Sequence, residues 1–338
     1  MGGRIRIWKP GIVYSGTQRC NDRTFLFKPN HRRDNPLLHE TCPPEALDPR
    51  NDLTPEPSTI NIIGSSVARA HEKHPVDITW WESNINHQHP GLRPTEEQLE
   101  NIAPFLQTAN SLIARGINKR YEHEGHVFSG PVRFTPCVDD VSAEQQLLYA
   151  LTNPVKDGLI ESVGRSPFFS TFRAQAKGEP LRYWYIDWDA FWLKGGFRKK
   201  GNRPKDFLEW VELPITSLPE WAEWPDHKIQ SRIRHGVRDI EGETGRLLRS
   251  EGRSVSGVPA LYAVDPRERP RKPKSSGPQP ICHAADRQLA REYVKRWREV
   301  LNEHRKASWD FRLGYYEREF PQGTYRPPLS TIYNSSHL

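Results

Sequence analysis

Strand-like and helix-like segments alternate along the first 175 residues, and this order limits the fold more than any other feature of the sequence. Residues 12–27 predict two extended segments, IVYSGTQ and TFLF, on either side of a polar turn. Residues 76–81 (VDITWW) alternate like a half-buried strand, and HVFSGPVRFTPCV predicts a further strand that Gly130 and Pro131 interrupt.

Helical patterns separate these strands. Apolar residues recur at helical spacing within residues 59–73. The sequence TEEQ has the form of a capping box, and Pro104 suits the first turn of a helix that runs to about Tyr121. SAEQ, which begins at Ser142, is a second capping box and predicts a helix that Pro154 ends. Interspersed strands and helices with short turns predict an antiparallel α+β sandwich.

The composition changes at about residue 176, where tryptophans follow one another among charges and prolines. We therefore expect one domain over residues 1–175, with a loop insertion at 29–57, and a mostly helical, loop-rich C-terminal extension over 176–338. A basic linker is expected at 265–280, and an amphipathic helix at about 284–306. That helix suits packing on the first domain, on a second copy of the chain or on DNA.

Trp184, Trp188 and Trp192 recur at helical spacing within the extension. They suit either a stacking surface for nucleic-acid bases or a buried aromatic cluster. Residues 226–250 predict a basic helix.

The overall charge favours a polyanionic partner. The formal net charge is +7, which suits nucleic acid without identifying it. None of the four cysteines lies in a CxxC pair, so the sequence holds neither a zinc knuckle nor a thioredoxin motif. The start MGGRIRIWK lacks an apolar stretch, and no segment approaches the length of a membrane helix. We expect a cytoplasmic protein with no membrane partner.

Two histidines follow the strand predicted at 76–81. His87 and His89 stand two residues apart, so that on a strand both imidazoles point to one face and converge on one ion. The alternative is a pair of solvated loop histidines.

A second polar row lies on the helix expected after Ser142. Gln145, Tyr149 and Asn153 are four residues apart and therefore share one helix face. A tyrosine with an amide one turn further on suits a nucleophile beside a metal ligand. The alternative is an ordinary tyrosine at the boundary of the core.

These pieces resemble the single-tyrosine HUH transposases, in particular the REP-associated group and its longer bacterial relatives. The family has two histidines around one residue on a central strand, often after an asparagine, which matches Asn86 to His89. It also has a helix with a tyrosine followed by Asn-Pro-Val-basic-x-Gly-Leu, which matches YALTNPVKDGLIES at 149–162. GIVYSGTQRCNDRTFLF, GHVFSGPVRF, PICHAADRQLAREYVKRW and FPQGTYRPPL resemble further parts of longer members.

The resemblance implies a ferredoxin-like fold, with a four- or five-stranded antiparallel sheet and helices packed on it. It implies that His87 and His89 bind Mg²⁺ or Mn²⁺, with Asn153 as a third protein ligand. Tyr149 would attack a phosphodiester of single-stranded DNA bearing a hairpin, giving a 5′-phosphotyrosine intermediate before strand rejoining. Such proteins are cytoplasmic in bacteria and occur as monomers or homodimers.

Five basic residues are candidates for contacts with DNA phosphates. Phosphate contacts give affinity without reading sequence, and each of these residues also suits a solvated surface charge. The candidates are Arg115, Lys119, Arg120, Arg133 and Lys156.

The sequence also departs from the family pattern. Gln88 replaces the apolar residue between the histidines, and the dipeptide of Pro90 and Gly91 predicts a strand that breaks directly after His89. An inactive DNA- or RNA-binding protein derived from such a transposase is therefore an alternative. A metal-dependent hydrolase is a weaker one, because no acidic pair or third histidine stands near His87 with suitable spacing.

Overall fold

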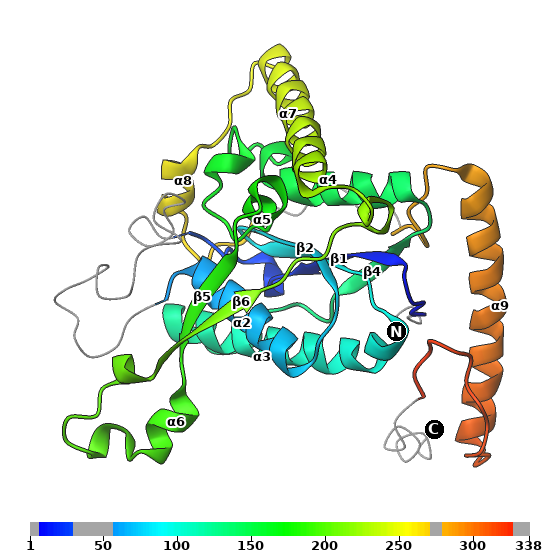
Figure 1. The fold of residues 1–338 in the computed structure, drawn as a ribbon, viewed down its shortest axis with the longest axis horizontal. Helices are drawn as coiled ribbons and strands as arrows, with labels where there is room; N and C mark the ends of the chain where they lie inside the picture. Colours follow the sequence, from blue (N-terminus) through cyan, green and yellow to red (C-terminus); the bar gives the residue numbers. More distant parts are fainter. Residues whose placement is uncertain (1–6, 30–56, 271–278, 327–338) are drawn as a thin grey trace.

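The computed structural model describes residues 7–29, 57–270 and 279–326 (Figure 1). Most of the loop insertion expected at 29–57 and much of the basic linker expected at 265–280 lie outside the described residues.

A four-stranded antiparallel sheet forms the centre of the molecule. Its order is β2-β3-β1-β4, so β3 and β1 are the inner strands. With one helix between β1 and β2 and another between β3 and β4, this is the strand order of a ferredoxin-like fold, as expected. The strands are β1 (Val13–Arg19), β2 (Ile78–Asn84), β3 (His87–Leu92) and β4 (Arg133–Cys137).

Helices cover both faces of this sheet. Figure 1 shows α2 and α3 together on one face and α4 on the other, with α7 packed on α4. The first pair encloses the main apolar core, which includes Ile63, Phe105 and Trp81. The helices are α2 (Thr59–Lys73), α3 (Ile102–Tyr121), α4 (Asp140–Lys156), α5 (Phe172–Lys177), α6 (Trp188–Leu193), α7 (Asp226–Ser250), α8 (Val258–Ala263) and α9 (Arg287–Arg312).

The strand break predicted after His89 is wrong, because β3 continues to Leu92. Two glycines make room for it. A Cβ on Gly16 of β1 would come within 2.8 Å of the Pro90 ring, and a Cβ on Gly91 would come within 2.1 Å of the Trp80 indole. Pro90 pairs with Trp81 in the sheet register. The proline therefore sits in an inner strand, and the register that carries both histidines stays intact.

Gln88 takes part in a buried polar chain on the α2/α3 face of the sheet. Its Oε1 accepts from Trp81 Nε1 at 3.1 Å, and its Nε2 donates to Gln18 Oε1 at 2.6 Å. Gln18 in turn donates to the Gly130 carbonyl at 2.8 Å. Because the amide is satisfied, a polar residue is tolerated at this buried position.

Three local predictions are wrong. TFLF does not form a strand, because Asp22 and Arg23 adopt left-handed φ values of 52° and 62° and turn the chain away from the sheet. The helix predicted from Ser142 begins earlier: Asp139 is its N-cap, and the Ser142 N–H donates to Asp139 Oδ1 at 2.6 Å. Pro154 does not end this helix, which continues through it to Lys156.

A two-stranded hairpin, β5 (Leu181–Ile186) and β6 (Leu208–Leu213), packs on α2. Asn61 on α2 donates to the Trp184 carbonyl at 2.7 Å and accepts the Trp184 N–H at 3.1 Å. Trp184 is thus a strand residue, and the helical spacing predicted for it with Trp188 and Trp192 is wrong. The division at residues 175 and 176 stays a prediction, and α5 spans it.

The helices predicted in the C-terminal part are present. The basic helix expected at 226–250 is α7, and the amphipathic helix expected at about 284–306 is α9, which continues to Arg312. Within the described ranges, no helix has the length and apolar character needed to cross a membrane.

Replacing Gly91 by alanine tests the packing that keeps β3 intact. The new methyl group would collide with the buried Trp80 ring, so we expect the free energy of unfolding to fall by about 1–3 kcal/mol. Urea unfolding followed by circular dichroism measures it. Gly130→Ala is the matched control, because a Cβ there meets nothing within 4 Å. Equal stability of the two variants would contradict the packing described.

Candidate active site

Helix α4 lies across the face of the sheet that carries the histidine pair. Ala143, Leu147 and Leu151 of this helix pack in one cluster with Val13 of β1 and Trp80 of β2. This apolar contact turns the polar face of α4 toward β3. Tyr149 and Asn153 are on that face. A single copy of the chain therefore supplies both the helix and the histidines of the candidate site.

The four sequence-predicted groups lie close together. The His87 and His89 rings have centroids 4.8 Å apart, and those of His89 and Tyr149 are 5.8 Å apart. Asn153 Oδ1 lies 2.9 Å from His87 Nε2, and Asn153 Nδ2 lies 3.4 Å from the Tyr149 hydroxyl. The histidines and Asn153 are buried, whereas Tyr149 is 39% exposed. A tyrosine at the surface therefore lies over three buried polar side chains.

Burial keeps both imidazoles neutral. Desolvation, with the charge of Arg19 nearby, lowers the pKa of His87 to about 4. Desolvation and the neighbouring His87 lower the pKa of His89 to about 3. Neutral imidazole is the form that binds metal ions, so the pair is in its ligand form at neutral pH.

The donor set fits a divalent cation. His89 Nε2 is buried without a hydrogen-bond partner, while its Nδ1 lies 3.3 Å from the Thr17 hydroxyl. His87 Nε2 and Asn153 Oδ1 lie 2.9 Å apart, and an imidazole nitrogen and an amide oxygen are both donor atoms that can bind a divalent cation. The described residues include no cluster of three or more His, Cys, Asp or Glu side chains suited to a metal, so a third protein ligand here would be the Asn153 amide.

Three polar residues that the sequence did not single out support this set. Asn84 donates to Asn153 Oδ1 and to Asp157 Oδ2, both at 2.9 Å. Thr17 contacts His89, as described above. Such outer groups orient the residues that they touch. Polar residues alternate along β1 at Ser15, Thr17 and Arg19, and this is the one sequence signal that could have pointed to Thr17.

The Tyr149 phenol is not activated by the protein alone. Desolvation and the carboxylate of Asp157 raise its pKa, and these effects exceed the opposing influence of Asn153 and Arg19. The Lys156 ammonium lies 5.0 Å from the centre of the Tyr149 ring. A phenolate at this position therefore needs further positive charge.

The five basic candidates divide between the two sides of the sheet. Lys156 is on α4 beside Tyr149, and Arg133 is an exposed residue of β4 that pairs with Thr17 in the register. Arg115, Lys119 and Arg120 are on α3, which packs against the opposite face. Arg120 donates to the Pro57 carbonyl at 2.8 Å. The structure thus places Lys156 beside Tyr149 and Arg133 opposite Thr17 in the sheet, and it adds the exposed Arg19, whose charge acts on Tyr149.

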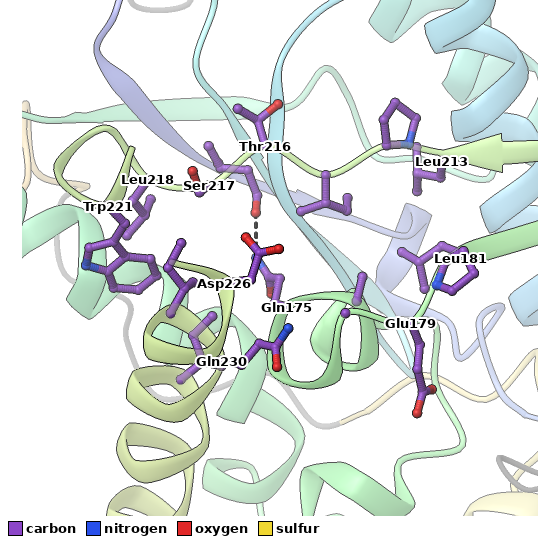
Figure 2. Close-up of a pocket in the computed structure, with 18 of the residues that line it drawn as sticks. Gln175, Glu179, Leu181, Leu213, Thr216, Ser217, Leu218, Trp221, Asp226 and Gln230 are labelled. Carbon is purple, nitrogen blue, oxygen red and sulfur yellow. Dashed lines mark hydrogen bonds between the residues drawn. The ribbon is translucent and has the colours of Figure 1, made fainter. Parts of the chain in front are cut away.

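A separate hollow of about 270 Å³ lies between α5, α7 and the segment after β6 (Figure 2). Gln175 crosses it and donates to the Thr79 carbonyl at 2.6 Å. Its lining holds the acids Glu179, Glu212 and Asp226 and no histidine, cysteine, tyrosine, lysine or arginine. This hollow therefore suits neither a metal–tyrosine site nor a phosphate.

Comparison with known proteins does not identify the activity of this site. No protein-family model matches the chain, and no curated protein matches it. Among solved structures, a REP-associated tyrosine transposase bound to a REP hairpin aligns with 64% of this chain and 100% of its own length. The sequence identity is 16% and the TM-score is 0.35, which is too low to assign an activity.

The buried His89 predicts a pH-dependent stability. The unfolded imidazole titrates near 6.5 and the folded one near 3, so between these values the unfolded chain binds more protons and acid destabilises the fold. From about pH 7 to about pH 5, wild type should lose about 2 kcal/mol more stability than His89→Gln.

Urea unfolding at both pH values measures this difference. Glu82, whose pKa burial raises to about 7, acts in the opposite sense in both proteins and cancels in the comparison. The exposed His227→Gln is the control and should follow wild type. A His89→Gln variant with the pH dependence of wild type would rule out a neutral buried imidazole.

Proposed function

We propose that this protein is a transposase that cuts and rejoins single-stranded DNA through a covalent bond to Tyr149. The observation that supports it most strongly is the position of the Tyr149 ring, 5.8 Å from that of His89, over a buried histidine pair with an unpartnered Nε2. A phosphate held by these groups would lie within reach of the phenol. The ferredoxin-like sheet supplies the rigid frame that such a site requires.

The proposed step exchanges one phosphodiester for another. The Tyr149 oxygen forms a bond to phosphorus, and the bond from phosphorus to the 3′ oxygen breaks. The phenol proton leaves to solvent, which reaches the 39% exposed side chain, and the departing 3′ oxygen takes up a proton. The product is a 5′-phosphotyrosine and a free 3′-OH, and reversal with another 3′-OH rejoins strands without a nucleotide cofactor.

His87, His89 and Asn153 would hold the Mg²⁺ or Mn²⁺ ion. When bound, the ion supplies positive charge that polarises the phosphate and favours the phenolate. The protein's own residues position the reaction: Asn84 and Thr17 orient the donor groups, and the burial of both imidazoles keeps them unprotonated. Arg19, Arg133 and Lys156 would bind the phosphates on either side of Tyr149.

The proposed partner is a single strand of DNA that bears a hairpin. A tyrosine at the protein surface suits a strand that passes over it, and the cations on its face suit a phosphate backbone. We expect the protein to act in the cytoplasm of a bacterium, as a monomer or as a homodimer.

A labelled-adduct assay tests the reaction. Hairpin-bearing single strands with randomised flanks are labelled at the 3′ end, because the 3′ portion stays on the enzyme. With Mg²⁺ or Mn²⁺, wild type should give a labelled band on a denaturing gel. EDTA and Tyr149→Phe should abolish the band. Tyr315→Phe, an exposed tyrosine 68% accessible on the C-terminal segment, is the matched control.

The label position adds a second check. The same strands labelled at the 5′ end should release a labelled fragment and leave the protein unlabelled. An adduct with unchanged yield in Tyr149→Phe would contradict the proposed nucleophile. No adduct from wild type would favour the alternative of a DNA- or RNA-binding protein without chemistry.

Metal binding can be tested without turnover. Titration with Mn²⁺, followed by electron paramagnetic resonance, should give one site in wild type. His89→Ala and Asn153→Ala should weaken it by at least about 10-fold, since even the loss of an outer partner costs about 10- to 100-fold. His227→Ala should bind as wild type does. Equal Mn²⁺ affinity in all four proteins would show that His89 and Asn153 do not bind the metal.

A further inference from the structure

The segment between β5 and β6 forms a small lobe with an aromatic centre. The lobe comprises residues 187–207 and contains α6. Figure 1 shows it projecting from the end of the hairpin, away from α4. Phe191 is fully buried, with the ring centroids of Trp192 at 5.2 Å, Phe197 at 4.8 Å and Phe207 at 5.5 Å. The lobe is therefore a folded unit, held by its own aromatic contacts.

Apolar side chains also cover the outside of this lobe. Trp192 is 56% exposed, Leu193 88% and Phe197 57%. The Trp192 ring lies against Gly196, where a Cβ would come within 2.2 Å of it, and it meets the Phe197 ring at a centroid distance of 5.6 Å. Gly196 has a φ of 55°, so the turn that brings it under the indole favours glycine. The exposed rings are thus held in fixed positions.

Basic residues are concentrated in the sequence next to these exposed rings. Six lysines and arginines and no acid occur in the twelve residues 194–205. Arg198, Lys199 and Lys200 are exposed, and no ion pair within the described part of the chain involves them. Unpaired cations beside open aromatic faces have the chemistry of a single-stranded nucleic-acid surface, where bases stack and phosphates bind lysine and arginine.

The lobe lies against the basic side of α3, by which we mean the side that carries Arg115 and Lys119. Lys119 on α3 lies over the Trp188 ring, with 4.4 Å from its Nζ to the ring centre. Arg115 is one helical turn before Lys119 and is exposed. The cations that face away from Tyr149 are therefore part of the same surface as the lobe.

We infer that the lobe of residues 187–207, together with the basic side of α3, is a second binding surface for single-stranded nucleic acid. In choosing DNA as its ligand the inference rests on the proposed function, but the surface needs neither Tyr149 nor a metal. Trp192 and Phe197 stack on bases, and Arg198, Lys199 and Lys200 contact phosphates. It would hold a strand on the side of the sheet opposite the reactive tyrosine.

Fluorescence anisotropy of a labelled oligo-dT strand tests this surface in the full-length protein, with EDTA present so that no reaction occurs. Replacing Trp192 and Phe197 together by alanine should weaken binding by about 5- to 150-fold for each base stack that is lost. Trp309→Ala, an exposed tryptophan on α9, is the matched control and should bind as wild type does.

A charge variant gives an independent measurement. Replacing Arg198, Lys199 and Lys200 by alanine should reduce the slope of log affinity against log salt by about 2, at about 0.7 for each phosphate contact. Replacing Arg238, Arg246 and Arg249 on α7 by alanine removes the same amount of charge elsewhere on the protein. This control variant should keep the slope of wild type. Thermal unfolding shows that each variant is folded, and the charge variant changes only exposed side chains.

Unchanged affinity and slope in the two lobe variants would overturn the inference. The same holds if the aromatic variant loses binding to vesicles containing phosphatidylserine while it keeps its oligo-dT affinity, since the lobe would then bind a membrane surface. The proposed reaction fails separately, through an unchanged adduct in Tyr149→Phe. Loss of oligo-dT binding in the lobe variants together with normal binding by Tyr149→Phe would support the inference even then.

Discussion

The buried amide of Asn153 fixes helix α4 over the sheet, and the candidate site depends on this contact. Its Oδ1 accepts from Asn84 at 2.9 Å and lies 2.9 Å from His87 Nε2, while its Nδ2 reaches toward the Tyr149 hydroxyl. A buried amide without these partners would be costly, so the helix has one favourable position along the strands. The apolar contact of Leu147 and Leu151 brings α4 to the sheet, and the amide helps to specify its register, together with the bond from the Ser15 hydroxyl to Gln146 Oε1 at 3.2 Å.

The two faces of the sheet use polar groups differently. On the α2/α3 face, Gln88 and Gln18 satisfy each other inside an apolar core and leave no group to bind a ligand. On the α4 face, His89 Nε2 stays without a partner and the phenol of Tyr149 reaches solvent. Alternation along β3 separates these roles, because successive side chains point to opposite faces. One strand can therefore stabilise the core on one face and carry the histidine pair on the other.

Much of the architecture followed from local patterns. The bounds of α2 and α7 match the predicted ranges, because their apolar residues recur at helical spacing. The predictions failed where a distant partner decides the outcome. The sequence of Pro90 and Gly91 indicates a break, yet Gly16 on another strand accommodates the proline ring. Likewise, the cap of α4 is Asp139, whose second carboxylate oxygen accepts backbone N–H groups of residues 285 and 286, far away in the chain.

The sequence by itself determined the residue types and their spacing: two imidazoles on one strand face, and a tyrosine and an amide one helical turn apart. These depend only on the periods of strand and helix. Only the tertiary structure decided that the two rows meet and that Arg115 and Lys119 lie on the other side of the sheet. It also decided that Trp184 belongs to a strand while Trp188 and Trp192 belong to a projecting lobe. Periodicity fixes the face on which a side chain lies, whereas the packing of one element on another fixes what that face meets.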